Sequence, residues 1–243
     1  MTSMRRTVLI APVFAGPVFA LLAGALLLTT FPLRSQSALA DTYAIDKEHT
    51  EVRFTWDHLG LSRQGGRFVD VNGSLQFDEA RPNASKVGVI IRVASLWTGV
   101  AALDSQLVKS REFFDAAKHP TITFESTEVR QTSAKTADVI GDLTINGTPR
   151  PVVLNVTWNF AGGHPMAKIN PAFSDLHVAG FSATTQIRRS DWGLTRTVPF
   201  VSDEIQISIE TELKRTAISA PAAAGDHDDA PVILAPLPAP VAE

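Results

Sequence analysis

The strongest constraint on this chain is a regular alternation of apolar and polar residues that recurs in eight separate segments. In the first of them, Val52, Phe54 and Trp56 are apolar, whereas the residues between them are polar. This period of two is typical of half-buried β-strands, because successive side chains point to opposite faces of a sheet. Eight such strands indicate an all-β antiparallel barrel or sandwich. The predicted strands are 52–56, 68–77, 87–93, 122–128, 139–145, 152–160, 179–187 and 205–213.

Turn residues separate several of these segments. Asn146-Gly147 stands between two predicted strands, and Asn-Gly is the preferred pair of a type I′ hairpin, so these two strands should pair directly. Gly65-Gly66 and Asn72-Gly73 are expected to be further turns or bulges, since glycine tolerates positive φ.

The sequence predicts helix only in a short insert between two strands. Residues 100–110 place Val100, Leu103 and Leu107 on one side of a helix, and residues 112–118 continue as a second short turn. The apolar side of this insert needs a surface to cover. We therefore expect it to lie over the open mouth of a barrel.

The two ends of the chain differ in composition from the rest. Residues 1–40 contain Arg5 and Arg6, an uncharged apolar run and the small-residue site Ala38-Leu39-Ala40, which together are typical of a secretory signal peptide cleaved after Ala40. The alternative is a retained anchor, because the run is long enough to span a bilayer. Residues 216–243, rich in Ala and Pro, are predicted to be a disordered tail. We expect one domain over residues 41–215, periplasmic or secreted.

Charge and cysteine content exclude several classes of function. Removing residues 1–40 takes away three arginines and no acidic residue, which changes the net charge from −3 to −6. This acidic balance argues against nucleic acid as a partner. The chain has no cysteine, so neither disulfides nor thiolate metal sites contribute to the fold, and the hydrophobic core must stabilise it alone.

The chain carries an ordered set of motifs over about residues 42–213. They are Ile45-Asp46-x-x-His49-Thr50, His58-x-Gly60, Gly66-Arg67-Phe68, Thr98-Gly99, Asp104-x-x-Leu107-x-x-Ser110-x-x-Phe113-Phe114-Asp115, His119-Pro120, Gly141-Asp142-Leu143-Thr144-Ile145-Asn146-Gly147 and Arg189-Ser190-Asp191-Trp192-Gly193-Leu194. This ordered set resembles the YceI-like family of polyisoprenoid-binding, lipocalin-like periplasmic proteins. One position departs from the pattern, since the family commonly has His where this chain has Gln106; Gln can hydrogen-bond a polar head group but carries no charge.

The resemblance implies an extended lipocalin-like barrel of eight antiparallel strands with a short helical insert and an internal tunnel. It implies a bound isoprenoid lipid or quinone-like amphiphile, with no other cofactor required. A homodimer and a transient contact with a membrane or membrane protein are kept open. The alternation indicates which strand residues face inward, and the helical insert is expected to line the entrance. The predicted ligand-binding residues are therefore Phe54, Trp56, Phe77, Val89, Ile91, Leu103, Leu107, Phe113, Phe114, Phe124, Leu143, Leu154, Val156, Trp158, Phe181 and Ile207.

Motifs for catalysis or metal binding are weak, so we predict a non-enzymatic binding protein without a metal. The chain has neither H-E-x-x-H nor G-x-S-x-G. His58 and His177 are on predicted strands and would form a metal site only if they met across the barrel. Two alternatives remain: an enzyme acting on a lipid through His58 or Asp104, and a stress-related interaction protein that docks through its tail.

The sequence does not determine the roles of three arginines near strand ends. Arg92, Arg188 and Arg189 are expected on the solvated face. Alternatively, Arg189 pairs with the carboxylate of Asp191, or an arginine stands at the tunnel mouth and faces a phosphate or quinone oxygen.

Overall fold

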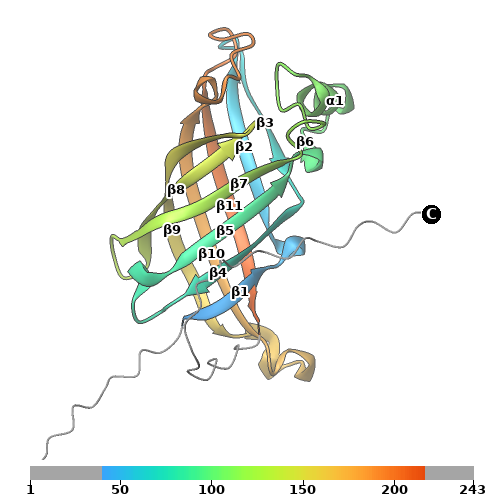
Figure 1. The fold of residues 1–243 in the computed structure, drawn as a ribbon. Coiled ribbons are helices and arrows are strands. Elements are labelled where there is room, and N and C mark those ends of the chain that lie inside the picture. Colours follow the sequence, from blue (N-terminus) through green and yellow to red (C-terminus); the bar gives the residue numbers. More distant parts are fainter. Residues whose placement is uncertain (1–39, 217–243) are drawn as a thin grey trace, which may run out of the picture. The chain divides into compact units, whose positions relative to one another are not determined.

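The strands of this protein wind around a common axis into a closed, tilted barrel (Figure 1). The computed structural model describes residues 40–216. The predicted leader and tail therefore lie outside the described residues, apart from Ala40 and Thr216. The strands are β1 (Asp41–Ile45), β2 (Glu51–His58), β3 (Ser62–Phe68), β4 (Val71–Phe77), β5 (Lys86–Arg92), β6 (Leu96–Trp97), β7 (Thr121–Gln131), β8 (Thr136–Ile145), β9 (Thr148–Gly163), β10 (His177–Arg188) and β11 (Glu204–Arg215).

Six of these strands are halves of longer ones, so the barrel wall has eight strands. β1 and β2 are separated by the 3₁₀ turn Lys47–His49, and both pair with β11. β3 pairs with β2 and β6, while β4 pairs with β1 and β5, so the two halves of each long strand lie between the same two neighbouring strands. All pairings in the ring are antiparallel and join sequence neighbours, and β11 closes the ring on β1 and β2. The predicted eight-stranded antiparallel barrel is confirmed.

The Asn146-Gly147 hairpin is confirmed as well. Asn146 and Gly147 have φ of 50° and 73°, as a type I′ turn requires, and Ile145 pairs directly with Thr148. Asn146 also donates from Nδ2 to the carbonyl of Phe113 at 2.7 Å. The turn that joins β8 to β9 therefore holds the segment that follows the helix.

Two dipeptides that were expected to form turns or bulges lie inside regular strands instead, so these predictions were wrong. Gly65-Gly66 belongs to β3 and Asn72-Gly73 to β4, each in regular register. The predicted strand 68–77 is interrupted at 69–70, between β3 and β4. Gly66 is needed for space, because a Cβ there would come 2.8 Å from Cζ of Phe54. The glycine makes room for a ring inside the barrel.

The ends of the barrel carry the remaining elements. The helix α1 (Ala101–Lys109) lies at one end, together with the β2–β3 hairpin and residues 189–203 (Figure 1). Its position between the strand ending at Trp97 and β7 agrees with the predicted insert. The opposite end carries residues 164–176, with the 3₁₀ turns Pro165–Lys168 and Pro171–Phe173. Within residues 40–216, no helix has the length and apolar character needed to cross a membrane.

Candidate functional site

The barrel encloses a cavity of about 710 Å³. This volume is within the range of pockets that bind small molecules and cofactors. All sixteen residues predicted to bind a ligand stand in its wall. Alternation could not distinguish a packed barrel from a hollow one, and the structure shows that this barrel is hollow. Contact of these sixteen side chains with a ligand stays a prediction.

Aromatic side chains form two groups along the cavity. Phe54 stacks on Trp56 with ring centroids 5.9 Å apart, and it lies 5.4 Å from Phe68. Phe114, which follows α1, meets Phe68 edge-on at 5.8 Å, so the segment after the helix is packed onto the cavity wall. The flat, apolar rings of this aromatic group are suited to contact with an apolar chain.

The second aromatic group lies on the strands that continue to the opposite end. Phe77 meets Trp158 and Phe181 edge-on, at centroid distances of 5.1 and 5.4 Å. Trp158 and Phe181 are paired residues of β9 and β10. Between the two groups the wall is mainly aliphatic, with inward-facing residues such as Val89, Leu143 and Ile207, and it includes the ring of Phe124 between Val89 and Leu143.

We call the opening near α1 the helix mouth, lined by His58, Gln64, Gln106, Arg189, Arg196 and Thr197. Arg189 is buried, with 8% of its surface exposed, and donates to the backbone carbonyls of Leu194, Arg196, Val201 and Ser202 at 2.5–2.9 Å. Burial lowers the pKa of its guanidinium, and the charge of Asp203 opposes that change. Arg189 therefore fixes the loop that shapes this mouth.

The roles considered for the three arginines can now be compared with their contacts. The expected solvated position is correct for Arg92 and Arg188, which are both exposed, and Arg92 pairs with Asp70 at 2.9 Å. It is wrong for Arg189. Asp191 is also not its partner, since all four of its hydrogen bonds go to backbone carbonyls. The predicted pair with Asp191 is wrong because the backbone carbonyls of residues 194–202 accept the hydrogen bonds of the guanidinium instead.

Another cation of the helix mouth is fixed by a side chain. Arg196 donates from Nη1 to Glu112 Oε1 at 2.5 Å, and both side chains are about half exposed. This ion pair connects the 194–203 loop to the segment that follows α1. Nearby, Asp104 accepts hydrogen bonds from the backbone N and Oγ1 of Thr98 at 2.7 and 2.6 Å. Asp104 thus fixes the start of α1, and it is not part of the cavity wall.

We call the opposite opening the lysine mouth, lined by Pro82, Ser85, Lys86, Gln131 and residues 133–136. The 3₁₀ turn Pro82–Ala84 is attached to the end of β7, because Gln131 donates its backbone N–H to Asn83 Oδ1 at 2.7 Å. Lys135 places its Nζ 3.5 Å from the centroid of the Trp158 ring. An ammonium group therefore lies at the inner aromatic edge of this opening.

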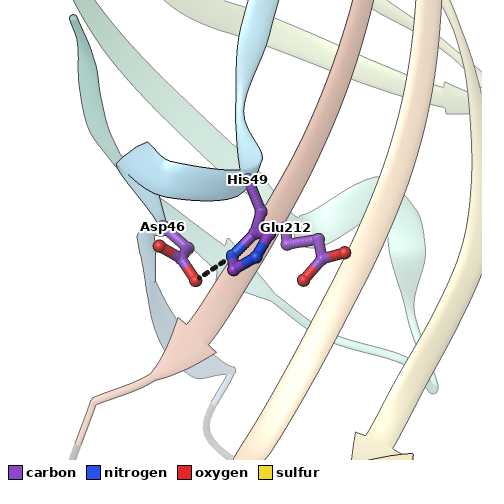
Figure 2. Close-up of side chains that lie close together, drawn as sticks. All are labelled: Asp46, His49 and Glu212. Carbon is purple, nitrogen blue, oxygen red and sulfur yellow. Dashed lines mark hydrogen bonds and ion pairs between the residues drawn. The ribbon is translucent and has the colours of Figure 1, made fainter.

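A cluster of Asp46, His49 and Glu212 lies outside the cavity, at the break between β1 and β2 (Figure 2). Burial raises the pKa of Asp46, but hydrogen bonds from Lys214 and His49 outweigh it and hold the pKa at about 2. Asp46 Oδ2 lies 2.8 Å from Lys214 Nζ and 2.9 Å from His49 Nδ1. The hydrogen bond to Asp46 raises the pKa of His49. Because the ammonium of Lys214 in β11 already pairs with this carboxylate, the cluster attaches the turn between β1 and β2 to β11. We call it the Asp46 clamp.

The metal site considered across the barrel is excluded by geometry. His58 bridges to Val201 at the helix mouth, whereas His177 starts β10 at the opposite end, two residues before Ala179 pairs with Leu213. His58 lines the cavity and His177 does not. Gln106, the position at which the family commonly has His, also lines the helix mouth.

Comparison with known proteins establishes the family to which this chain belongs. The family model described as YceI-like domain matches residues 43–213. The chain belongs to the YceI-like family. The UPF0312 protein of Pseudomonas savastanoi pv. phaseolicola is 39% identical to this YceI-like chain over 190 residues, covering 77% of the chain and 94% of the relative. The UPF0312 protein of Pseudomonas syringae pv. tomato is 41% identical over 172 residues, covering 70% and 85%.

Solved structures share the barrel. A YCEI protein from Campylobacter jejuni has 28% identity and a TM-score of 0.56, covering 66% of this YceI-like chain and 90% of that chain. BcnA from Burkholderia cenocepacia has 24% identity and a TM-score of 0.59, with 69% and 98% covered. A polyisoprenoid binding domain from Saccharophagus degradans has 13% identity and a TM-score of 0.53, with 74% and 100% covered. The last two likenesses establish the fold alone.

Sequence reasoning considered Gln106 and an arginine at a tunnel mouth, both of which the helix mouth contains, but it missed the lysines of the opposite mouth. Alternation assigns Lys86 to the outer face of its strand, whereas the structure places it at the edge of the cavity, and Lys135 precedes the first residue of β8 and lies outside the predicted strands. Ala183 and Thr185 of β10 also line the cavity but are small, and the predicted set favoured large side chains. Their place on the inward face of β10 was a usable signal, since Phe181 and Ile187 have the same parity.

Proposed function

We propose that this protein binds, sequesters or transports a long-chain isoprenoid or quinone-like amphiphile without changing it chemically. The observation that carries this proposal is the hollow barrel, whose wall is aromatic and aliphatic between two polar mouths. At about 25 cal/mol per Å² of buried apolar surface, several hundred Å² of chain would offset the cost of ordering it. The fold is shared with a domain named for polyisoprenoid binding, which supports this ligand class.

A binding role also agrees better with the wall than catalysis does. Within the described part of the chain, no aspartate or glutamate belongs to the wall, so a general acid–base pair would have to be built on His58 without a carboxylate partner. Asp104, the other candidate, already accepts two hydrogen bonds at the start of α1. We propose that binding takes place in the periplasm or outside the cell, after cleavage behind Ala40.

Native mass spectrometry of the full chain, purified after expression with its leader, tests both parts of the proposal. The mass of the chain reports cleavage, and extraction of the complex identifies the lipid. We expect about one amphiphile per chain. An Ala183→Trp variant fills the cavity from β10 and should retain at least tenfold less lipid. Its matched control, Thr184→Trp, adds the same side chain at the next position, which is exposed and absent from the wall.

The outcomes separate clearly. Wild-type protein that carries no stoichiometric amphiphile, and takes none up on reloading, contradicts the binding function. Equal lipid in the Ala183→Trp and Thr184→Trp proteins would mean that the lipid is bound outside the barrel. Circular dichroism of both variants verifies that each one is folded.

A further inference from the structure

We infer that the amphiphile carries an anionic oxygen head group, a phosphate or carboxylate, and that the head lies at the lysine mouth with the chain pointing towards α1. This inference rests on the proposed function, because it names the ligand class and its orientation in the same cavity. It stands on three observations: the sign of the wall charges, the unequal pairing of the cations, and the groups around Trp158.

All charged side chains of the described wall have the same sign. They are Lys86, Lys135, Arg189 and Arg196, and neither an aspartate nor a glutamate lines the cavity between residues 40 and 216. The whole chain has a net charge of −3, so this cationic lining runs against its overall balance. A wall that presents cations alone favours a ligand with negative charge or strong acceptor oxygens.

The cations of the two mouths differ in whether the protein pairs them. Arg189 donates to four backbone carbonyls, and Arg196 pairs with Glu112. Lys86 and Lys135 have no ion pair with any residue that the structure describes. The two ammonium groups of the lysine mouth are therefore the wall charges without an anionic partner among the described residues, and of these Lys135 contacts only the face of the Trp158 ring.

Trp158 adds a further donor at the same opening. Its ring faces Lys135 Nζ at 3.5 Å and contacts Phe77 edge-on. The Nε1–H of this indole is buried and has no hydrogen-bond acceptor in the described part of the chain. The lysine mouth thus holds two cations without a carboxylate partner among the described residues, and beside Lys135 lies a buried N–H without an acceptor, which is unusual because buried donors are normally satisfied.

A phosphate or carboxylate would supply what these groups lack. Charge-assisted hydrogen bonds from ammonium to anionic oxygen are about twice as strong as neutral ones. The attraction between ammonium and anion is stronger beside the apolar wall made by Phe77, Trp158 and Phe181 than in open water, because the local dielectric constant is lower. The apolar chain would then extend along the aliphatic middle of the cavity to the aromatic group beneath α1.

The test compares two probes that differ only in the head. Geranylgeranyl monophosphate and geranylgeraniol are titrated separately into the full chain, stripped of lipid, by isothermal titration calorimetry. The measured quantity is the ratio of the two Kd values, because the shared chain contribution cancels. We expect the phosphate to bind about tenfold more tightly or better, as one charge-assisted contact of about 1.4 kcal/mol would give.

Variants locate the head. Lys86→Met/Lys135→Met should reduce the ratio to about 1 while geranylgeraniol still binds. The control Lys118→Met/Lys168→Met removes the same charge from exposed positions outside the wall and should keep the wild-type ratio. Both double variants should keep the urea midpoint of the wild type, because all four lysines are exposed and surface substitutions usually change stability little.

Each other result overturns the inference in a distinguishable way. Binding of both probes with equal Kd leaves the proposed function intact and removes the anionic head. Loss of the ratio in Arg196→Gln, with the ratio retained in the lysine double variant, places the head at the helix mouth. Inorganic phosphate that binds as tightly as the prenyl phosphate shows a free-anion site instead. Failure of both probes overturns the inference and the proposed function together.

Discussion

The two mouths of the cavity contain the same kind of charge but use it differently. At the helix mouth, Arg189 and Arg196 are bound to carbonyls and to Glu112, and both connect the 194–203 loop to its surroundings. At the lysine mouth, Lys86 and Lys135 stand in the wall without a carboxylate partner among the described residues. A cation that the fold pairs stabilises the fold, whereas one left unpaired costs little to keep and remains available to a ligand.

The largest effect should come from removing the most completely bonded cation. Arg189→Ala leaves four carbonyls without their donor in a buried site, and we expect a loss of about 3 kcal/mol in the free energy of unfolding. Urea denaturation measures it. The matched control is Arg188→Ala, because Arg188 is the exposed neighbour and should change stability by less than about 0.5 kcal/mol. Equal losses in the two variants would break the distinction between paired and unpaired cations.

The Asp46 clamp contains a lysine that does have a carboxylate partner, Lys214, and so contrasts with the two lysines of the lysine mouth. The folded pKa of Asp46, about 2, lies below its ordinary 3.8, so the ionised form is favoured by folding. Its contribution of about 2 kcal/mol is complete above pH 4 and is lost as pH falls towards 2. Urea unfolding between pH 2 and 7 should show this slope in wild type and a flatter one in Asp46→Asn.

His49 gives the clamp a second, opposite pH dependence. Its pKa is raised by Asp46, so its contribution is complete below pH 6.5 and is lost as pH rises through the folded value. His49→Gln should therefore remove a small decline in the free energy of unfolding above pH 6.5. An unchanged decline in this variant would mean that another group titrates there.

The smallest effect concerns the ion pair at the rim of the helix mouth. Because Arg196 and Glu112 are both about half exposed, we expect a coupling energy of about 0.2–1 kcal/mol that decreases in high salt. A double-mutant cycle of Arg196→Gln and Glu112→Gln measures it by urea denaturation. A coupling above about 2 kcal/mol, insensitive to salt, would show that this pair is a buried structural element like Arg189.

The strands of the wall could be predicted because one physical pattern determines them. Phe54 and Trp56 face the cavity and their neighbours face water, so period two alone locates β2 and its counterparts. The breaks in the long strands were not predictable in this way. Gly66 resembles a turn residue by composition, but its role depends on the ring of Phe54, which comes from another strand.

The site was predictable only as far as it is apolar. Large inward-facing residues such as Leu154 and Phe181 follow from alternation, and the structure places them in the wall. Arg189 was beyond this reasoning, because its partners are backbone carbonyls of a loop whose path no side-chain pattern reveals. Lys135 reaches the mouth through a hairpin turn, and its position over Trp158 depends on the pairing of β8 with β9.

The closure of the ring by β1 and β11 has a consequence for protein engineering. Thr216 donates its backbone N–H to the carbonyl of Thr42 at 2.8 Å, and Arg215 pairs with Asp41 at 3.1 Å. A linker of a few residues would therefore join position 216 to position 41, and new termini could be opened in an exposed hairpin. Such a circular permutant would keep every strand pairing, because neighbour order around the ring, rather than the place where the chain starts, defines this barrel.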